Sequence, residues 1–101
     1  MQDQVIETVT FELNDNVTDQ AFLTANLAVE TFLEECPGFL SRRLSKGSDG
    51  TWLDYLEWRD MDSANAAAQR LPTEEKLRPF MASIKEGTAK MAHRQLALAV
   101  G

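Results

Sequence analysis

The chain has 101 residues, of which 44% are hydrophobic and 26% are charged, and this composition predicts one globular domain spanning residues 1–101. The formal net charge is −6 and no basic cluster is larger than Arg42-Arg43, which argues against nucleic acid as a partner. The single cysteine excludes an intrachain disulfide, and neither a signal peptide nor a membrane-spanning apolar run is found. We therefore expect a cytoplasmic protein with no membrane partner.

The first forty residues predict a strand followed by a helix. Residues 5–13 alternate between apolar and polar side chains and are rich in β-branched residues, which is typical of a strand. Residues 19–36 carry an apolar stripe at helical spacing, and Thr18 is placed to cap the helix at its N-terminus. Pro37 and Gly38 then end the helix, because proline cannot continue it and glycine permits a reversal of the chain.

The middle of the chain predicts a hairpin. Residues 39–46 and 51–60 read as two strands, and residues 47–50, with the sequence GSDG, read as a tight turn between them. Two strands joined by so short a connection must run antiparallel.

The last forty residues predict a second helix and a final strand. Asp62 can cap a helix whose alanines favour helical structure, and Pro72 breaks it. We expect irregular or short helical structure over residues 73–86, because a further proline interrupts this segment. Residues 90–100 predict the last strand, although their leucines and alanines alone would also suit a helix.

The resulting order, strand-helix-strand-strand-helix-strand, predicts an α+β fold of the ferredoxin-like, split βαβ type, with helices on one face of a four-stranded antiparallel sheet. The third strand is apolar on both faces, with Trp52, Leu56 and Trp58 on one side and Leu53 and Tyr55 on the other. Helices can cover only one of these faces. A second copy of the chain is the simplest cover for the other, so we expect a homodimer formed through the sheet faces.

The element order, the helix end PGFLSRRL, the strand with two tryptophans and the alanine-rich second helix resemble the antibiotic biosynthesis monooxygenase-like superfamily. The resemblance extends from Val5 to Val100. It implies a dimeric α+β barrel, in which two ferredoxin-like sheets pack face to face. Members of that superfamily include cofactor-independent oxygenases of phenols and quinols, and heme-degrading enzymes.

The heme-degrading branch fits this sequence poorly. Its members place an axial histidine on the second helix, whereas residues 61–90 contain no histidine and the only one in the chain is His93. One histidine and one cysteine are also too few to ligate zinc or copper. We therefore expect no metal site and no cofactor.

One face of the third strand is a candidate site for an aromatic ligand. Trp52 and Trp58 flank Asp54 there, so the rings could stack on a flat molecule while the carboxylate orients it or transfers a proton. The alternative is that both rings belong to the core or to a dimer interface. A buried Asp54 needs a partner in either case, and Arg43 on the neighbouring strand is the expected one.

Other candidates lie on the remaining elements. His93 could act as a base at neutral pH, or could be a hydrogen-bonded structural residue. Asn26 lies near the apolar stripe of the first helix, where it could orient a ligand or satisfy a strand carbonyl. Phe11 could form a wall of the pocket, and Glu7 interrupts the apolar face of the same strand.

These observations leave two functions open. The first is a dimeric protein that binds a small aromatic or hydrophobic ligand without chemistry. The alternative is a cofactor-independent monooxygenase of phenol or quinol substrates, with His93 or Asp54 as the base and a dry pocket for the substrate anion and oxygen. The pocket walls in either case are Trp52, Trp58 and Phe11, with Asn26 as the orienting group.

Overall fold

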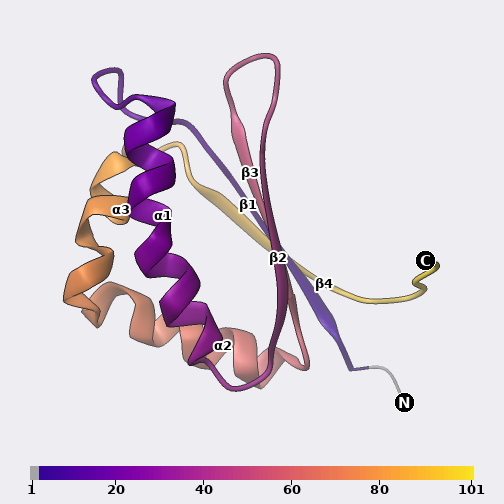
Figure 1. The fold of residues 1–101 in the computed structure, drawn as a ribbon. Coiled ribbons are helices and arrows are strands. Elements are labelled where there is room, and N and C mark those ends of the chain that lie inside the picture. The colour runs from indigo at the N-terminus through magenta and orange to yellow at the C-terminus, as the bar shows by residue number, and fades with distance from the viewer. Residues whose placement is uncertain (1–2) are drawn as a thin grey trace.

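The computed structural model describes residues 3–101 and contains a four-stranded antiparallel sheet with three α-helices (Figure 1). The sheet order is β2-β3-β1-β4, so the first and third strands occupy its centre. This is the expected ferredoxin-like arrangement. The elements are β1 (Val5–Phe11), α1 (Asp19–Glu34), β2 (Phe39–Lys46), β3 (Trp52–Trp58), α2 (Met61–Arg70), two short 3-10 turns (Leu71–Thr73 and Glu75–Leu77), α3 (Arg78–Ser83) and β4 (Lys90–Gln95).

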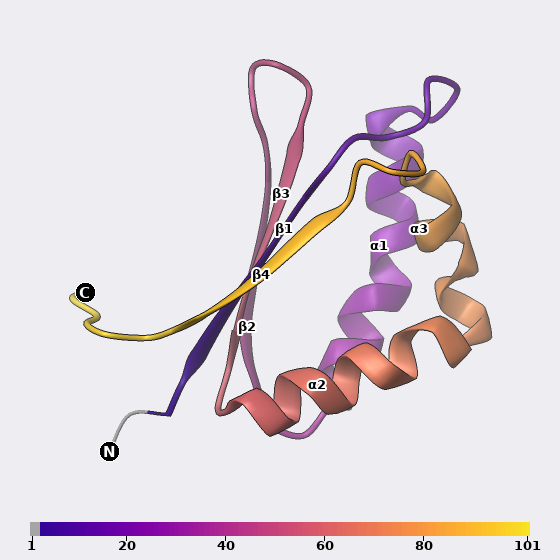
Figure 2. The same ribbon diagram turned by 180° about the vertical axis from the view of Figure 1, so that it is seen from behind.

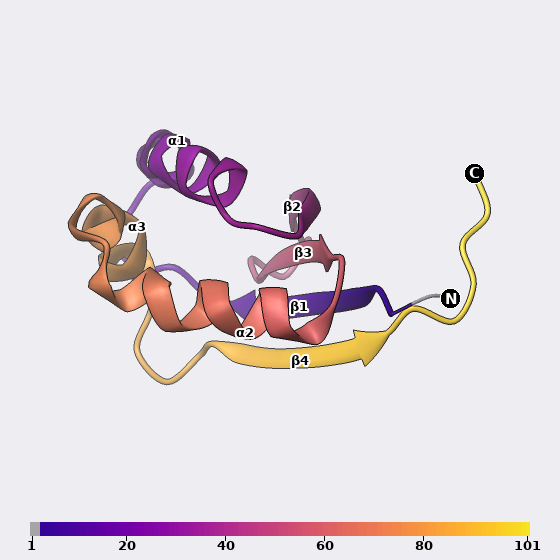
Figure 3. The same cartoon turned by 90° about the horizontal axis from the view of Figure 1, so that it is seen from below.

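All three helices lie on one side of the sheet, as the two opposite views show (Figures 1 and 2). Seen from below, the four strands follow one another from β2 to β4, and no helix or further strand of residues 3–101 covers the side away from the helices (Figure 3). The core fills the space between the sheet and the helices, and the opposite sheet face is bare in the single chain. None of the helices among the described residues is long and apolar enough to cross a membrane.

The first helix begins where the sequence predicts and ends two residues earlier. The hydroxyl of Thr18 accepts a hydrogen bond from the backbone N–H of Ala21, so the predicted cap is confirmed. The α-helix ends at Glu34. The backbone N–H groups that follow, up to that of Cys36, donate to carbonyls three residues back instead of four, which tightens the final turn. Gly38 follows with a φ of +83°, and a Cβ there would collide with the Ser63 side chain.

The second strand contains one extra residue near its start. Phe39 pairs with Trp58, but Ser41 already pairs with Glu57, so Leu40 has no partner of its own on β3. This β-bulge shifts the alternation of side chains by one position along the rest of β2. Which residues of β2 face the helices is therefore decided at Leu40.

Other element boundaries also differ from the sequence-based expectation. Asp60, not Asp62, caps α2, because its side chain accepts the backbone N–H of Ser63. The last strand ends at Gln95 instead of residue 100. The backbone N–H of Leu96 still donates to the Gln4 carbonyl, and no later residue pairs with β1 among the described residues. The first strand likewise ends at Phe11, where its ladder with β3 stops.

Candidate functional site

The structure decides which face of β3 meets the helices. The side chains of Trp52, Asp54, Leu56 and Trp58 are buried between the sheet and the helices. Leu53 and Tyr55 point to the bare face and are only half-buried in the single chain. The predicted site residues of β3 therefore belong to the interior of each chain, not to the exposed sheet face.

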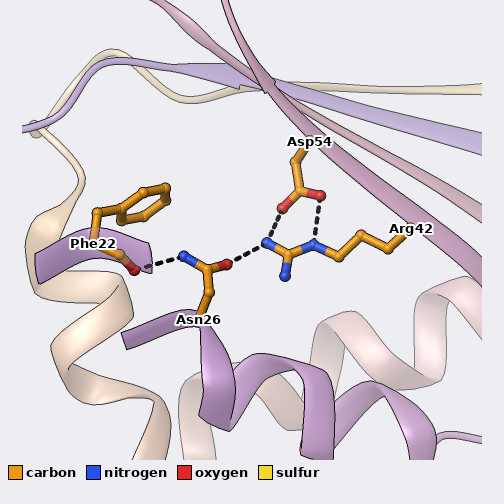
Figure 4. A network of polar contacts seen from close by, with 4 residues as sticks. All are labelled: Phe22, Asn26, Arg42 and Asp54. Carbon is orange, nitrogen blue, oxygen red and sulfur yellow. Dashed lines mark hydrogen bonds and ion pairs between the residues drawn. The ribbon is translucent and has the colours of Figure 1, made fainter. Parts of the chain in front are cut away.

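A polar network crosses this interior and joins the sheet to the first helix (Figure 4). The Arg42 guanidinium donates to both carboxylate oxygens of Asp54, through Nε and one terminal nitrogen, at 2.7 Å each. The same terminal nitrogen donates to Oδ1 of Asn26 at 2.7 Å, and the Asn26 amide donates to the Phe22 carbonyl at 2.8 Å. The side chains of the ion pair are only 9% and 10% exposed, so the pair is largely desolvated, and its contact is bidentate.

The partner of Asp54 is Arg42. The sequence alone predicts Arg43, and this prediction is wrong. The bulge at Leu40 is the reason, since it turns Arg42 toward the helices and Arg43 toward the bare face. Asn26 also differs from expectation, because its amide satisfies a carbonyl of its own helix and not one of a strand.

This network gives Asp54 a structural task. Both of its oxygens accept hydrogen bonds from a permanently charged guanidinium, so the carboxylate is engaged by Arg42 and held in place within the interior. The predicted catalytic role of Asp54 stays a prediction that this geometry does not favour.

Two of the predicted aromatic residues lie in a packed cluster. The Phe22 ring lies 4.9 Å from Trp52, 5.7 Å from Phe11 and 5.6 Å from Phe80, between ring centroids. Phe22 itself is fully buried. Edge-to-face and offset contacts at these distances are typical of an aromatic core. Trp52 and Phe11 thus lie at one end of the paired strands β3 and β1, and Trp58 lies at the other end. Their role in ligand binding stays a prediction.

A cavity of about 120 Å³ lies at the other end, next to Trp58. Its wall is apolar except for the Glu7 carboxylate and the Trp58 indole. The exposed members of the wall, Ala68 and Met91, place its mouth between α2 and β4. The wall consists of Glu7, Phe32, Leu33, Leu56, Trp58, Ala64, Ala67, Ala68, Leu71 and Met91.

Glu7 forms a polar group with Trp58 and His93 beside this cavity. The Trp58 indole donates to Glu7 Oε1 at 3.0 Å, and His93 Nε2 lies 3.4 Å from the same oxygen. Burial raises the pKa of the Glu7 carboxyl above its ordinary value; attraction to His93 and the hydrogen bonds from His93 and Trp58 offset only part of the shift, and repulsion from Asp54 adds to it. The structure therefore places a carboxyl of raised pKa in the cavity wall.

A larger hollow of about 360 Å³ lies on the surface around Cys36, Arg59 and Arg70. Its charges are partly paired with neighbouring acids, Arg59 with Asp60 and Arg70 with Glu74. Burial raises the pKa of the Cys36 thiol, which makes it a poor nucleophile. Among the described residues, no group of three or more acidic, histidine or cysteine side chains is arranged to hold a metal ion.

Sequence reasoning identified Trp58 and His93 but did not assign Glu7 to the site. The available signal was the charge of Glu7 on the apolar face of a strand. Burying an acid there costs free energy, so an acid in such a position often belongs to a functional site. From the sequence, the alanines of α2 indicate only a helix and give no sign of a cavity. In the structure, Ala64 and Ala67 leave the space that the cavity occupies.

Comparison with known proteins identifies the fold. No protein-family model and no curated protein matches the sequence. SnoaB, a cofactor-independent oxygenase from Streptomyces nogalater, has a TM-score of 0.78 to this chain over 97% of both chains, at 16% identity. A monooxygenase from the gene ActVA-Orf6 of Streptomyces coelicolor, solved with the ligand Nanaomycin D, has a TM-score of 0.69 at 21% identity, covering 98% of this chain and 92% of its own.

A third structure is of a protein from Bordetella bronchiseptica described as a putative antibiotic biosynthesis monooxygenase. It has a TM-score of 0.79 to this chain at 12% identity, and the match covers 96% of this chain and 100% of the other. The chain has the fold of the antibiotic biosynthesis monooxygenases. At identities of 21% and below, this likeness establishes the architecture alone, and function has to be argued from the site.

The buried ion pair yields a test of the network. Replacing Arg42 by methionine is expected to lower the free energy of unfolding by about 3–5 kcal/mol, because it leaves the Asp54 carboxylate buried without a partner. Urea denaturation measures the loss. The control is Arg78→Met, which removes an arginine whose side chain is 78% exposed and should change stability by less than about 0.5 kcal/mol. Equal effects of the two substitutions would contradict a structural role for the network.

Proposed function

We propose that this protein binds a small aromatic molecule, a phenol or quinol of one ring, in the cavity between the sheet and α2. The observation that carries the proposal is the composition of the cavity wall. It combines eight apolar side chains with one indole and one carboxylate. Ligand sites of proteins share this character, with an apolar lining and a few polar groups that fix orientation.

The volume of the cavity limits the size of the ligand. An apolar cavity of about 150 Å³ holds one benzene molecule, whereas sites for drug-sized ligands span about 300–1,000 Å³. At about 120 Å³, the cavity matches one ring more closely than a fused ring system. Met91 at the mouth is 54% exposed, and its flexible side chain can move to enlarge the space.

The polar groups of the wall suit a hydroxylated ring. The ring of Trp58 provides an aromatic surface for stacking, and the Glu7 carboxylate can accept a hydrogen bond from a hydroxyl group. The Trp58 N–H is already donated to Glu7, which orients both side chains before any ligand arrives. A hydroxyl-bearing ring therefore satisfies the carboxylate, and an unsubstituted ring does not.

Tryptophan fluorescence tests this binding site. In the Trp52→Phe variant, Trp58 is the only indole, so saturable quenching by phenol or hydroquinone reports on the cavity itself. Ala67→Leu fills the cavity and should weaken binding about 10-fold or more. The matched control is Ala66→Leu, on the same helix but outside this cavity, which should leave the affinity unchanged. Quenching that is absent, or that Ala67→Leu leaves intact, would contradict the proposal.

We further propose that two copies of the chain pack through the bare faces of their sheets, as the resemblance to dimeric α+β barrels implies. Ile6, Leu53 and Tyr55 lie on this face and are half-buried in the single chain. The apolar residues Leu98 and Val100 follow β4 and are 81% and 89% exposed. The C-terminal segment after β4 leaves the sheet on the side away from the helices (Figure 1). A second copy would remove this apolar surface from water.

Light scattering at micromolar concentration should find a dimer for the native chain. Tyr55→Glu places a charge in the centre of the proposed interface and is expected to shift the mass to that of one chain. Leu27→Glu is the control, because Leu27 is 62% exposed on the outer side of α1 and should leave the dimer intact. A native chain that is monomeric at this concentration would rule the interface out.

Cofactor-independent oxygenation is the second candidate function. It is supported by the carboxyl of raised pKa in the cavity wall, since such a reaction requires a base that converts a phenol or quinol to its electron-rich anion. The apolar lining would keep this anion away from water while it reduces oxygen. SnoaB, which shares the fold, is a cofactor-independent oxygenase.

Oxygen consumption distinguishes the two functions. If the protein is an oxygenase, a quinol that quenches Trp58 should also cause oxygen uptake that saturates at the same concentrations, and Ala67→Leu should abolish both. If it is a binding protein, the quinol should quench without uptake above the rate of its spontaneous oxidation. An oxygen electrode with hydroquinone, with Ala66→Leu as the control, provides the measurement.

A further inference from the structure

Among the described residues, Glu7 is the one buried carboxylate that lacks a permanently charged partner. It lies on β1 opposite Leu56 of β3 and opposite His93 of β4, and only 8% of its surface is exposed. Both contacts identified for its carboxylate, with Trp58 and His93, use Oε1. Oε2 accepts no hydrogen bond among the described residues. This second oxygen is therefore available to a molecule in the cavity that Glu7 lines.

The charges around Glu7 come from two neighbouring strands. His93 on β4 is the nearest titratable group, and Asp54 on β3 is the other, although its charge is paired with Arg42. The helices contribute no charged side chain to the cavity wall, since α1 and α2 present only phenylalanine, leucine and alanine there. The carboxyl thus faces a low-dielectric space in which its charged form is disfavoured.

His93 connects Glu7 with the surrounding water. Its side chain is 20% exposed, against 11% for that of Glu7, and one of its ring nitrogens lies 3.4 Å from Glu7 Oε1. His93 is not part of the cavity wall. It is consequently placed to exchange protons with Glu7 and with solvent, but not to touch a ligand in the cavity.

We propose that Glu7 Oε2 accepts the hydroxyl proton of a phenol or quinol in the cavity, and that His93 returns this proton to solvent. In the first step the O–H bond of the ligand breaks, its electron pair stays on the phenolate oxygen, and a new O–H bond forms on Glu7. In the second step the Glu7 O–H bond breaks, its electron pair returns to the carboxylate, and the proton passes to Nε2 of His93, the ring nitrogen beside the carboxyl group. The resulting imidazolium then releases a proton from Nδ1 to water. Both steps transfer a proton and leave every oxidation state unchanged, so neither step requires oxygen or another oxidant.

The inference rests on the proposed binding of a phenol in this cavity and adds a chemical activity to it. It assigns different roles to three titratable groups. Glu7 touches the ligand and is the base, His93 acts through Glu7 as a relay, and Asp54 takes no part because both of its oxygens are bound by Arg42. Burial raises the pKa of the Glu7 carboxyl, which makes its carboxylate a stronger proton acceptor than an ordinary one, as such a step requires.

The ionisation state of bound 4-nitrophenol tests the first step without any turnover. Free 4-nitrophenol and its phenolate differ in visible absorbance, so a titration with protein at slightly acidic pH reports the form that is bound. The native chain should bind the probe as phenolate at a pH where the free probe is largely neutral, and Glu7→Gln should bind it neutral. Glu12→Gln, an exposed acid that directly follows β1, is the matched control and should behave as the native chain.

The outcomes separate this inference from the proposed function. Neutral probe in the native chain, or equal ionisation in Glu7→Gln, would overturn the role of Glu7 while leaving the binding site in place. Failure of the native chain to bind the probe or phenol would overturn both. If Glu7→Gln does not fold, Glu7→Asp replaces it, because the shortened acid is withdrawn from the cavity and should ionise less of the bound probe.

The dependence of stability on pH provides a second readout, free of any ligand. Between the ordinary carboxyl pKa and the raised pKa of Glu7, the folded chain holds a proton that the unfolded chain has released. The free energy of unfolding of the native chain should therefore fall relative to that of Glu7→Gln as pH rises through this range. A difference that stays constant with pH would contradict the inference.

The relay has its own test in the rate of proton exchange. His93→Gln keeps a hydrogen-bonding side chain but cannot titrate, so bound 4-nitrophenol should still ionise, only more slowly. A stopped-flow pH jump should show exchange slowed by on the order of 10²-fold. An unchanged rate would exclude His93 as the relay, and lost ionisation would indicate that His93 is itself the base.

Discussion

The ion pair between Arg42 and Asp54 is the contact on which the interior depends. Two strands and a helix meet there, because the guanidinium bonds to Asp54 on β3 and to Asn26 on α1 from its own position on β2. A pair this deeply buried is tolerable only when its hydrogen bonds are satisfied, and all of its buried polar atoms are. The network holds α1 at a fixed position over the sheet. It also divides the interior into a packed aromatic end and an end with a cavity.

The two ends differ because of the helices that cover them. Phe22 and Phe80 fill the space above Trp52 with aromatic rings, whereas the alanines of α2 are too small to fill the space above Trp58 and Glu7. The two carboxylates of the interior consequently have opposite environments. Asp54 is neutralised by a permanent cation, and Glu7 faces an apolar wall and a histidine. Carboxyl groups placed in different environments within one site are a recurrent basis of acid-base chemistry in proteins.

The likeness to solved structures establishes the fold alone, so the functional proposal rests on the site. The proposals of a one-ring phenol and of proton transfer to Glu7 rest on a small cavity, an indole held by a carboxylate and a histidine at the edge. In these proposals deprotonation requires binding, and oxygenation would require both. The chain is thus a case in which the local chemistry, and not the architecture, carries the functional argument.

The sequence by itself determined the elements, their order and the fold, because the alternation of β1, the cap at Thr18 and the break at Pro37 are local signals. It also singled out Trp58, His93 and the two-sided third strand. Only the tertiary structure decided which face of that strand is interior, since alternation defines two sets of side chains but not their directions. It also decided that Arg42 and not Arg43 meets Asp54, because the extra residue at Leu40 reverses the alternation of β2. The contact of Glu7 with His93 joins residues 86 positions apart and depends on the pairing of β1 with β4, which no local pattern specifies.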